Sequence, residues 1–176
     1  SPREPYFLGP EALALGRRWS AAYGHVEAAR PVVRKLGRNL NEHVLLASMR
    51  GSSLYRLVET SPNQLVTVSP SYGTGGVSSS MATVKVLLAY ADPATREEAL
   101  KEMDVSSLPS VHQYNEELED VRRKGYAFSV NEAASDLTAV AVPVLDDCER
   151  AEAALGTAVP TSRCPTDRRR ELVEKL

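Results

Sequence analysis

The sequence has little cysteine, no excess of either charge and no long apolar segment. Its 176 residues include only Cys148 and Cys164, too few for a disulfide framework and too far apart for a paired redox or metal motif. The net charge of −2 provides no positive stripe for nucleic acid, so we expect that this chain does not bind DNA alone. No apolar run approaches the roughly 18 to 20 residues of a membrane span, and residues 1–5 show no signal pattern. We therefore expect a cytoplasmic protein without a membrane partner.

The sequence also lacks the residue patterns that catalysis and metal binding require. The serines at 78–80 belong to no Gly-x-Ser-x-Gly elbow, and His25, His43 and His112 have no paired spacing. There is no His-x-x-x-His motif, no clustered set of carboxylates and histidines, and no glycine fingerprint or phosphate loop. We therefore expect no enzyme, no metal and no cofactor.

What the sequence does contain is a regular succession of hydrophobic periods. Apolar residues spaced three and four apart predict helices, and alternation with period two predicts strands. The total is 43% hydrophobic, enough for one core, so we expect a single domain over 1–176 of the α+β class, with one antiparallel sheet flanked by helices. The expected helices are 10–23, 26–40 with a kink or restart at Pro31, 81–90, 93–103, 111–124 and 166–176, and the expected strands are 44–49, 54–59, 65–69, 126–130, 137–145 and 153–159.

The most informative stretch runs from Gln64 to Tyr90. A short apolar strand leads into a loop with three glycines and three serines, and a helix follows. Such loops let backbone N–H groups approach a ligand while the helix forms a rigid wall. The stretch therefore predicts a small-molecule site, with Ser78 or Ser79 expected to cap the helix.

The order of these elements and several short strings resemble the effector-binding domain of IclR-type bacterial transcription regulators. The matching strings are Tyr6–Pro10, Ala29–Pro31, Gly73 followed by Lys85–Ala89, Val121–Ala127, Ala141–Val144 and Pro160–Arg163. The resemblance implies a GAF-like fold, with a curved antiparallel sheet of about six strands and a pocket on one side. It also implies a winged helix-turn-helix ahead of this chain, through which alone operator DNA is bound. The remaining implications are a homo-oligomer, dimer or tetramer, and a small organic effector that alters operator binding.

By position, the resemblance also implies a set of pocket residues. The family's pocket would fall on Leu65, Val68, Ala82, Thr83, Ser129, Leu137, Ala139, Gly156 and Ala158. Members that bind small oxoacids have an aspartate, a cysteine and two serines where this sequence has Ser129, Ala139, Gly156 and Ala158.

Those differences remove hydrogen bonds that would orient a two- or three-carbon acid, and the small side chains enlarge the pocket. We therefore expect an effector larger and less polar than glyoxylate or pyruvate, such as an aromatic or alicyclic acid or amide. Tyr72 would contact it as well, and the polar anchors would be Ser129, Thr83 and the backbone near Ala82.

Two alternatives stay open on the sequence alone. One is a GAF-like assembly or scaffold domain with a degenerate pocket and no effector, and the other is an enzyme of this fold. The apolar stripe from Val26 to Leu40, together with Trp19 and Tyr23, is compatible with either a core or a dimer surface.

Overall fold

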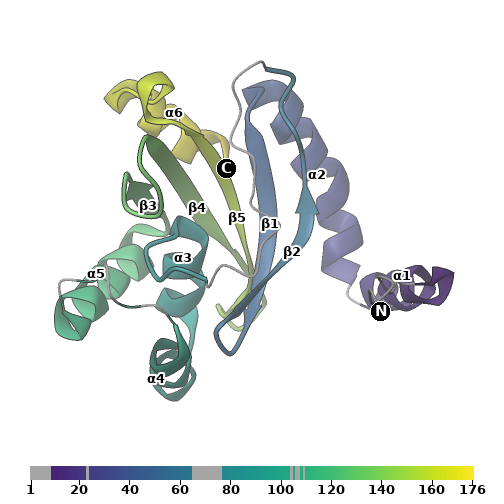
Figure 1. Ribbon diagram of the computed structural model, residues 1–176, viewed down its shortest axis with the longest axis horizontal. Helices are drawn as coiled ribbons and strands as arrows, with labels where there is room; N and C mark the ends of the chain where they lie inside the picture. The colour runs from purple at the N-terminus through teal and green to yellow at the C-terminus, as the bar shows by residue number, and fades with distance from the viewer. Residues whose placement is uncertain (1–8, 23, 65–76, 104, 106–107, 109) are drawn as a thin grey trace, which may run out of the picture.

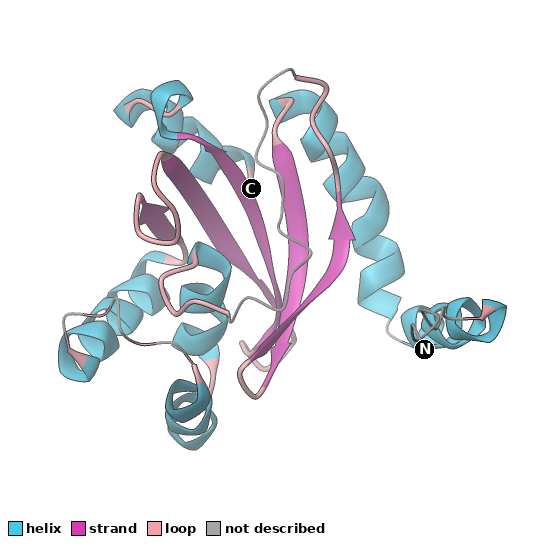
Figure 2. Ribbon diagram, in the orientation of Figure 1, coloured by secondary structure: helices cyan, strands magenta, loops and turns pink. Residues whose placement is uncertain are grey.

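The computed structural model describes residues 9–22, 24–64, 77–103, 105, 108 and 110–176. Helices surround one open sheet of five antiparallel strands in the order β2-β1-β5-β4-β3 (Figures 1 and 2). The predicted α+β class is confirmed, while the further strand expected at 65–69 lies outside the described residues. The elements are α1 (Pro10–Ala22), α2 (Gly24–Leu40), β1 (His43–Arg50), β2 (Ser53–Glu59), α3 (Ala82–Tyr90), α4 (Pro93–Glu102), α5 (Val111–Lys124), β3 (Ala127–Val130), β4 (Leu137–Leu145), β5 (Ala151–Pro160), a 3-10 turn (Thr161–Arg163) and α6 (Thr166–Lys175).

The alternation of side chains along the strands sorts the core into two layers. On one face, which we call the α2 face, Val44, Leu46 and Leu155 pack with Val33 of α2 and Leu172 of α6. The apolar stripe of α2 therefore belongs to the core, at least through its buried members. The side chain of Trp19 and the whole of Tyr23 lie outside the described residues.

The opposite face of the sheet, which we call the α3 face, is covered by a second group of helices. Ala127, Ala141 and Ala154 pack there against Val84 of α3 and Leu118 of α5. Figure 1 shows α3, α4 and α5 together on this side, with α2 on the other. The sheet therefore separates α2 and α6 from α3, α4 and α5.

Several element boundaries follow from local chemistry. Gly51 takes the positive φ of 55° that the β1–β2 turn needs, and Gly125, at φ 80°, ends α5. Asp92 caps α4 through the backbone of Thr95, and Ser110 caps α5 through that of Gln113. Each of these four boundaries therefore depends on one residue and its immediate neighbours.

One expectation about the first helices is wrong, and of the kink or restart expected at Pro31 the restart is excluded. α1 ends at Ala22, and Gly24, expected to end that helix, begins α2 instead. α2 then runs through Pro31 to Leu40 as one helix, so the proline does not mark a restart. None of the described helices is long and apolar enough to cross a membrane.

Candidate ligand-binding site

The strand register brings several predicted site residues into one row on the α3 face. Ser129 on β3 lies opposite Ala139 on β4, and Ala139 lies opposite Ala158 on β5. Gly156 is two residues before Ala158 on the same face, and Leu137 of β4 is two residues before Ala139. The floor beneath α3 is therefore built mostly from small side chains.

Three other predicted site residues, Leu65, Val68 and Tyr72, lie outside the described residues.

The first turn of α3, which contains the predicted residues Ala82 and Thr83, rests directly on this floor. A Cβ atom added to Gly156 would lie 3.0 Å from Cγ2 of Thr83 and 3.1 Å from the backbone oxygen of Val140. Any larger residue here would require Thr83 or the backbone of Val140 to shift by a few tenths of an ångström. Thr83 and Gly156 thus fix how near the start of α3 sits to the sheet.

The N-terminus of α3 has no side-chain cap in the described part of the chain, so the expected cap by Ser78 or Ser79 is wrong. Met81 occupies the N-cap position with extended backbone. The hydroxyl of Ser78 instead lies 2.7 Å from that of Ser80 and accepts from the Ser80 backbone N–H. The first N–H groups of a helix have no partner within it and carry the positive end of the helix dipole, so they favour an anionic or carbonyl oxygen.

Two buried polar contacts hold α3 in place. The Lys85 side chain is fully buried, and its Nζ donates to Glu117 of α5 at 2.6 Å and also pairs with Glu132 beyond β3. The hydroxyl of Tyr114 on α5 donates to the backbone oxygen of Ser79 at 2.5 Å. Burial raises the pKa of Tyr114 well above its ordinary value, so this phenol remains a donor. The entry into α3 is therefore tied to α5, and the helix itself to α5 and to the segment that follows β3.

A polar pair that was not predicted from the sequence, His43 and Glu59, lies on the same face. His43 lies opposite Ala158 and so extends the row of Ser129, Ala139 and Ala158 onto β1. Its Nε2 is 3.5 Å from Oε2 of Glu59 on β2. Burial lowers the pKa of His43, an effect that Glu59 opposes only in part.

The sequence pattern alone could place His43 on a face of the sheet but could not identify its neighbours. The expected strand began at Val44, whereas β1 begins at His43, one position earlier. The alternation of that strand places His43 on the α3 face with Leu45, but only the pairing with β5 shows that Ala158 is its neighbour.

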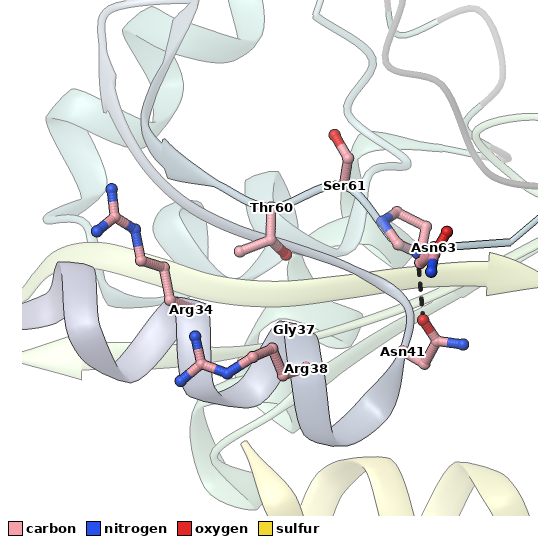
Figure 3. Close-up of a pocket in the computed structure, with 8 residues that line it drawn as sticks. Arg34, Gly37, Arg38, Asn41, Thr60, Ser61 and Asn63 are labelled. Carbon is pink, nitrogen blue, oxygen red and sulfur yellow. Dashed lines mark hydrogen bonds between the residues drawn. The ribbon is translucent and has the colours of Figure 1, made fainter.

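A separate cavity of about 380 Å³ opens between α2 and the segment that follows β2 (Figure 3). Arg34 and Arg38 of α2 lie on one side of it, with Thr60 and Asn63 across from them. The backbone N–H of Asn63 donates to Asn41 at 3.2 Å and closes one end. None of the predicted site residues lines this cavity.

The described residues contain no group of three or more His, Cys, Asp or Glu side chains placed to hold a metal ion.

Comparisons with known proteins agree with the fold. Residues 23–176 match the family model described as "Bacterial transcriptional regulator IclR C-terminal". The chain is 26% identical over 168 residues to the HTH-type transcriptional regulator BhcR of Paracoccus denitrificans (strain Pd 1222). The match covers 93% of this chain but only 60% of BhcR, so the chain spans less than two thirds of this relative.

Two solved structures are informative. An IclR transcriptional regulator from Alicyclobacillus acidocaldarius superposes with a TM-score of 0.78 at 25% identity, over 97% of this chain and 71% of that one. The inducer-binding domain of a double mutant of PobR from Acinetobacter, in complex with 3-hydroxybenzoic acid, has a TM-score of 0.67 at 19% identity. That match covers 84% of this chain and 92% of the PobR domain, and it supports the fold alone.

Proposed function

Because this chain belongs to the IclR C-terminal family of bacterial transcriptional regulators, we propose that it is the effector-sensing and oligomerising domain of a longer regulator. The whole of 1–176 serves as one effector-binding domain. A winged helix-turn-helix outside this chain binds the operator in the cytoplasm, and the assembly is a dimer or tetramer. The name of the HTH-type relative, of which this chain spans 60%, supports that division of labour.

The effector lies against the α3 face of the sheet. The observation that carries this proposal is the row of small side chains on β3, β4 and β5 beneath a helix N-terminus that has no side-chain cap among the described residues. The effector contacts Ala82, Thr83, Ser129, Leu137, Ala139, Gly156 and Ala158, together with Leu65, Val68 and Tyr72.

The effector is an aromatic or alicyclic acid or amide, larger and less polar than glyoxylate or pyruvate. The floor formed by the alanines and Gly156 offers room for a flat ring. Among the floor residues on β3, β4 and β5, Ser129 is the only one with a hydroxyl group. The acid or amide oxygen lies at the first N–H groups of α3, where the helix dipole favours it. The solved complex of the PobR domain with an aromatic acid is consistent with a ring on this fold.

A binding screen with a blocking variant tests this proposal. The chain is titrated calorimetrically with benzoate, cyclohexanecarboxylate, their amides, glyoxylate and pyruvate, and its melting temperature is followed at high ligand concentration. A ligand at 100 times its dissociation constant adds about 2.7 kcal/mol to the free energy of unfolding. We expect stabilisation by the ring compounds and none by the oxoacids.

The blocking variant is Ala158→Leu, which fills the floor between β4 and β1. We expect it to abolish binding of the ring compounds. The matched control is Ala28→Leu on the exposed side of α2, which adds the same side chain outside the site and leaves binding unchanged. Micromolar binding of pyruvate would overturn the effector class. Absence of binding by every compound would favour a domain that only assembles.

A further inference from the structure

His43 is a buried histidine whose hydrogen bonding is incomplete. It is 6% exposed, and within the described part of the chain its Nε2 makes no hydrogen bond. Its nearest charged neighbour there is Oε2 of Glu59, at 3.5 Å. A buried polar atom without a hydrogen bond lowers stability, so such an atom in a native protein calls for a partner, such as an ordered water, an ion or a bound ligand.

The position of His43 links it to the floor beneath α3. β1 lies one strand spacing, about 4.8 Å, from β5. His43 is opposite Ala158, and Leu45 next to it is opposite Gly156, on which the first turn of α3 rests. Between the start of α3 and His43 the described sheet presents Ala139 and Ala158, with Leu45 beside them on β1, so a ring can lie over the two alanines with one end at α3 and the other at His43.

The protonation and charge of His43 and Glu59 determine which chemical group can bind between them. Burial favours the neutral imidazole, and Arg56, whose charge also acts on this histidine, opposes its protonation. A neutral imidazole cannot compensate a second carboxylate placed beside Glu59, and an apolar group would leave the imidazole nitrogen without a hydrogen bond. A hydroxyl group can accept from the Nε2–H of His43 while donating to the Glu59 carboxylate, so it forms a hydrogen bond with each.

We propose that His43 and Glu59 recognise a hydroxyl group at the far end of the effector, which makes the effector a hydroxy-substituted ring acid. The inference rests on the effector site proposed above for the α3 face. To that site it adds two specificity-determining residues, His43 and Glu59, and the functional group that they bind. The hydroxyl end lies at β1 and β2, and the acid end lies at the start of α3.

The test compares probes that differ only in the hydroxyl. Isothermal titration of the full chain with 3-hydroxybenzoate, 4-hydroxybenzoate and benzoate measures the preference for a hydroxyl at either ring position. In the unaltered protein we expect the better hydroxybenzoate to bind about tenfold more tightly than benzoate, the effect of one or two hydrogen bonds to a neutral imidazole and a carboxylate. His43→Ala and Glu59→Gln should each reduce that preference to about twofold, measured as the ratio of hydroxybenzoate to benzoate affinity within each variant.

The chain supplies a matched control pair. His112 and Glu116 on α5 also form a histidine–glutamate contact, at 3.6 Å, but their side chains are 85% and 66% exposed. His112→Ala and Glu116→Gln should keep the full preference for the hydroxyl. His43→Gln, which restores an N–H donor, should recover part of it. Retained benzoate binding shows that each variant is folded with an intact floor.

The outcomes separate this inference from the function on which it rests. Equal binding of benzoate and both hydroxybenzoates by the unaltered protein, or an unchanged preference in both His43→Ala and Glu59→Gln, overturns the hydroxyl site but not the effector site. Failure of all three probes, together with the other ring compounds, overturns both. Loss of benzoate binding in His43→Ala with its melting temperature preserved would assign His43 to the acid end and also overturn the inference.

Discussion

Replacing Gly156 by alanine tests how closely α3 approaches the sheet. The added methyl group would lie 3.0 Å from Cγ2 of Thr83, 3.1 Å from the backbone oxygen of Val140 and 3.3 Å from Cβ of Ala141. Gly156 does not have a positive φ, so the substitution strains contacts and not the backbone. Overpacking of this kind costs about 1–3 kcal/mol, and the lower entropy of the unfolded chain returns about 0.4–1 kcal/mol. We expect a net loss of about 1–2 kcal/mol from the free energy of unfolding.

Urea unfolding of the single and double variants measures this effect. Thr83→Ser removes the nearest contact atom while keeping the hydroxyl, so we expect Gly156→Ala to cost less in that background, by at least about 0.5 kcal/mol. Gly16→Ala is the control, because a Cβ on that residue of α1 meets nothing within 4 Å and the change should only raise helix propensity. A neutral Gly156→Ala, or strictly additive effects with Thr83→Ser, would refute the close approach of α3.

Three further predictions concern the buried polar groups. Changing Glu117 and Glu132 together to glutamine leaves the buried Lys85 ammonium without a counter-charge and should cost about 3 kcal/mol or more in urea unfolding, whereas either single change should cost much less. Tyr114→Phe removes a buried hydrogen bond to the segment preceding α3 and should cost about 1–3 kcal/mol, with weaker binding of ring acids in calorimetry. The lowered pKa of His43 means that the unfolded chain binds more protons just below pH 6.5, so the free energy of unfolding should fall as the pH drops from about 6.5 through the folded pKa. His43→Asn should remove that part of the pH dependence, measured by urea unfolding at several pH values.

The features that could be predicted from the sequence are those decided within a few residues. The caps at Asp92 and Ser110 and the turn at Gly51 each depend on one side chain or one glycine and its immediate neighbours. Strand periodicity was equally local, although β5 runs from Ala151 to Pro160, longer than the expected 153–159. The extension follows from pairing with β4, where Leu145 meets Ala151 and Leu137 meets Pro160.

What could not be predicted depends on contacts distant in the sequence. The period of α2 shows that it has an apolar side but not which face of the sheet it covers. The serines at 78–80 suit a cap, yet Ser78 turns its hydroxyl to Ser80 and leaves Met81 at the N-cap. His43 looked like an isolated strand start, because its partner Ala158 is more than a hundred residues away.

The location of His43 also bears on how an effector on the α3 face would influence the rest of a regulator. α2 ends at Leu40 on the opposite face, and only Asn41 and Glu42 separate it from His43. Glu42 is buried and paired with Arg163 at 2.8 Å, which anchors this short link to the turn after β5. A ligand shifts a conformational equilibrium only by the difference in its affinity for the two states, with a typical coupling of about 1–3 kcal/mol. A hydroxyl bound by His43 would apply that difference in affinity at the residue where the chain passes from α2 into the sheet. Since α1 lies at the far end of α2 (Figure 1), this is the shortest covalent route from the proposed site to the N-terminal side of the domain.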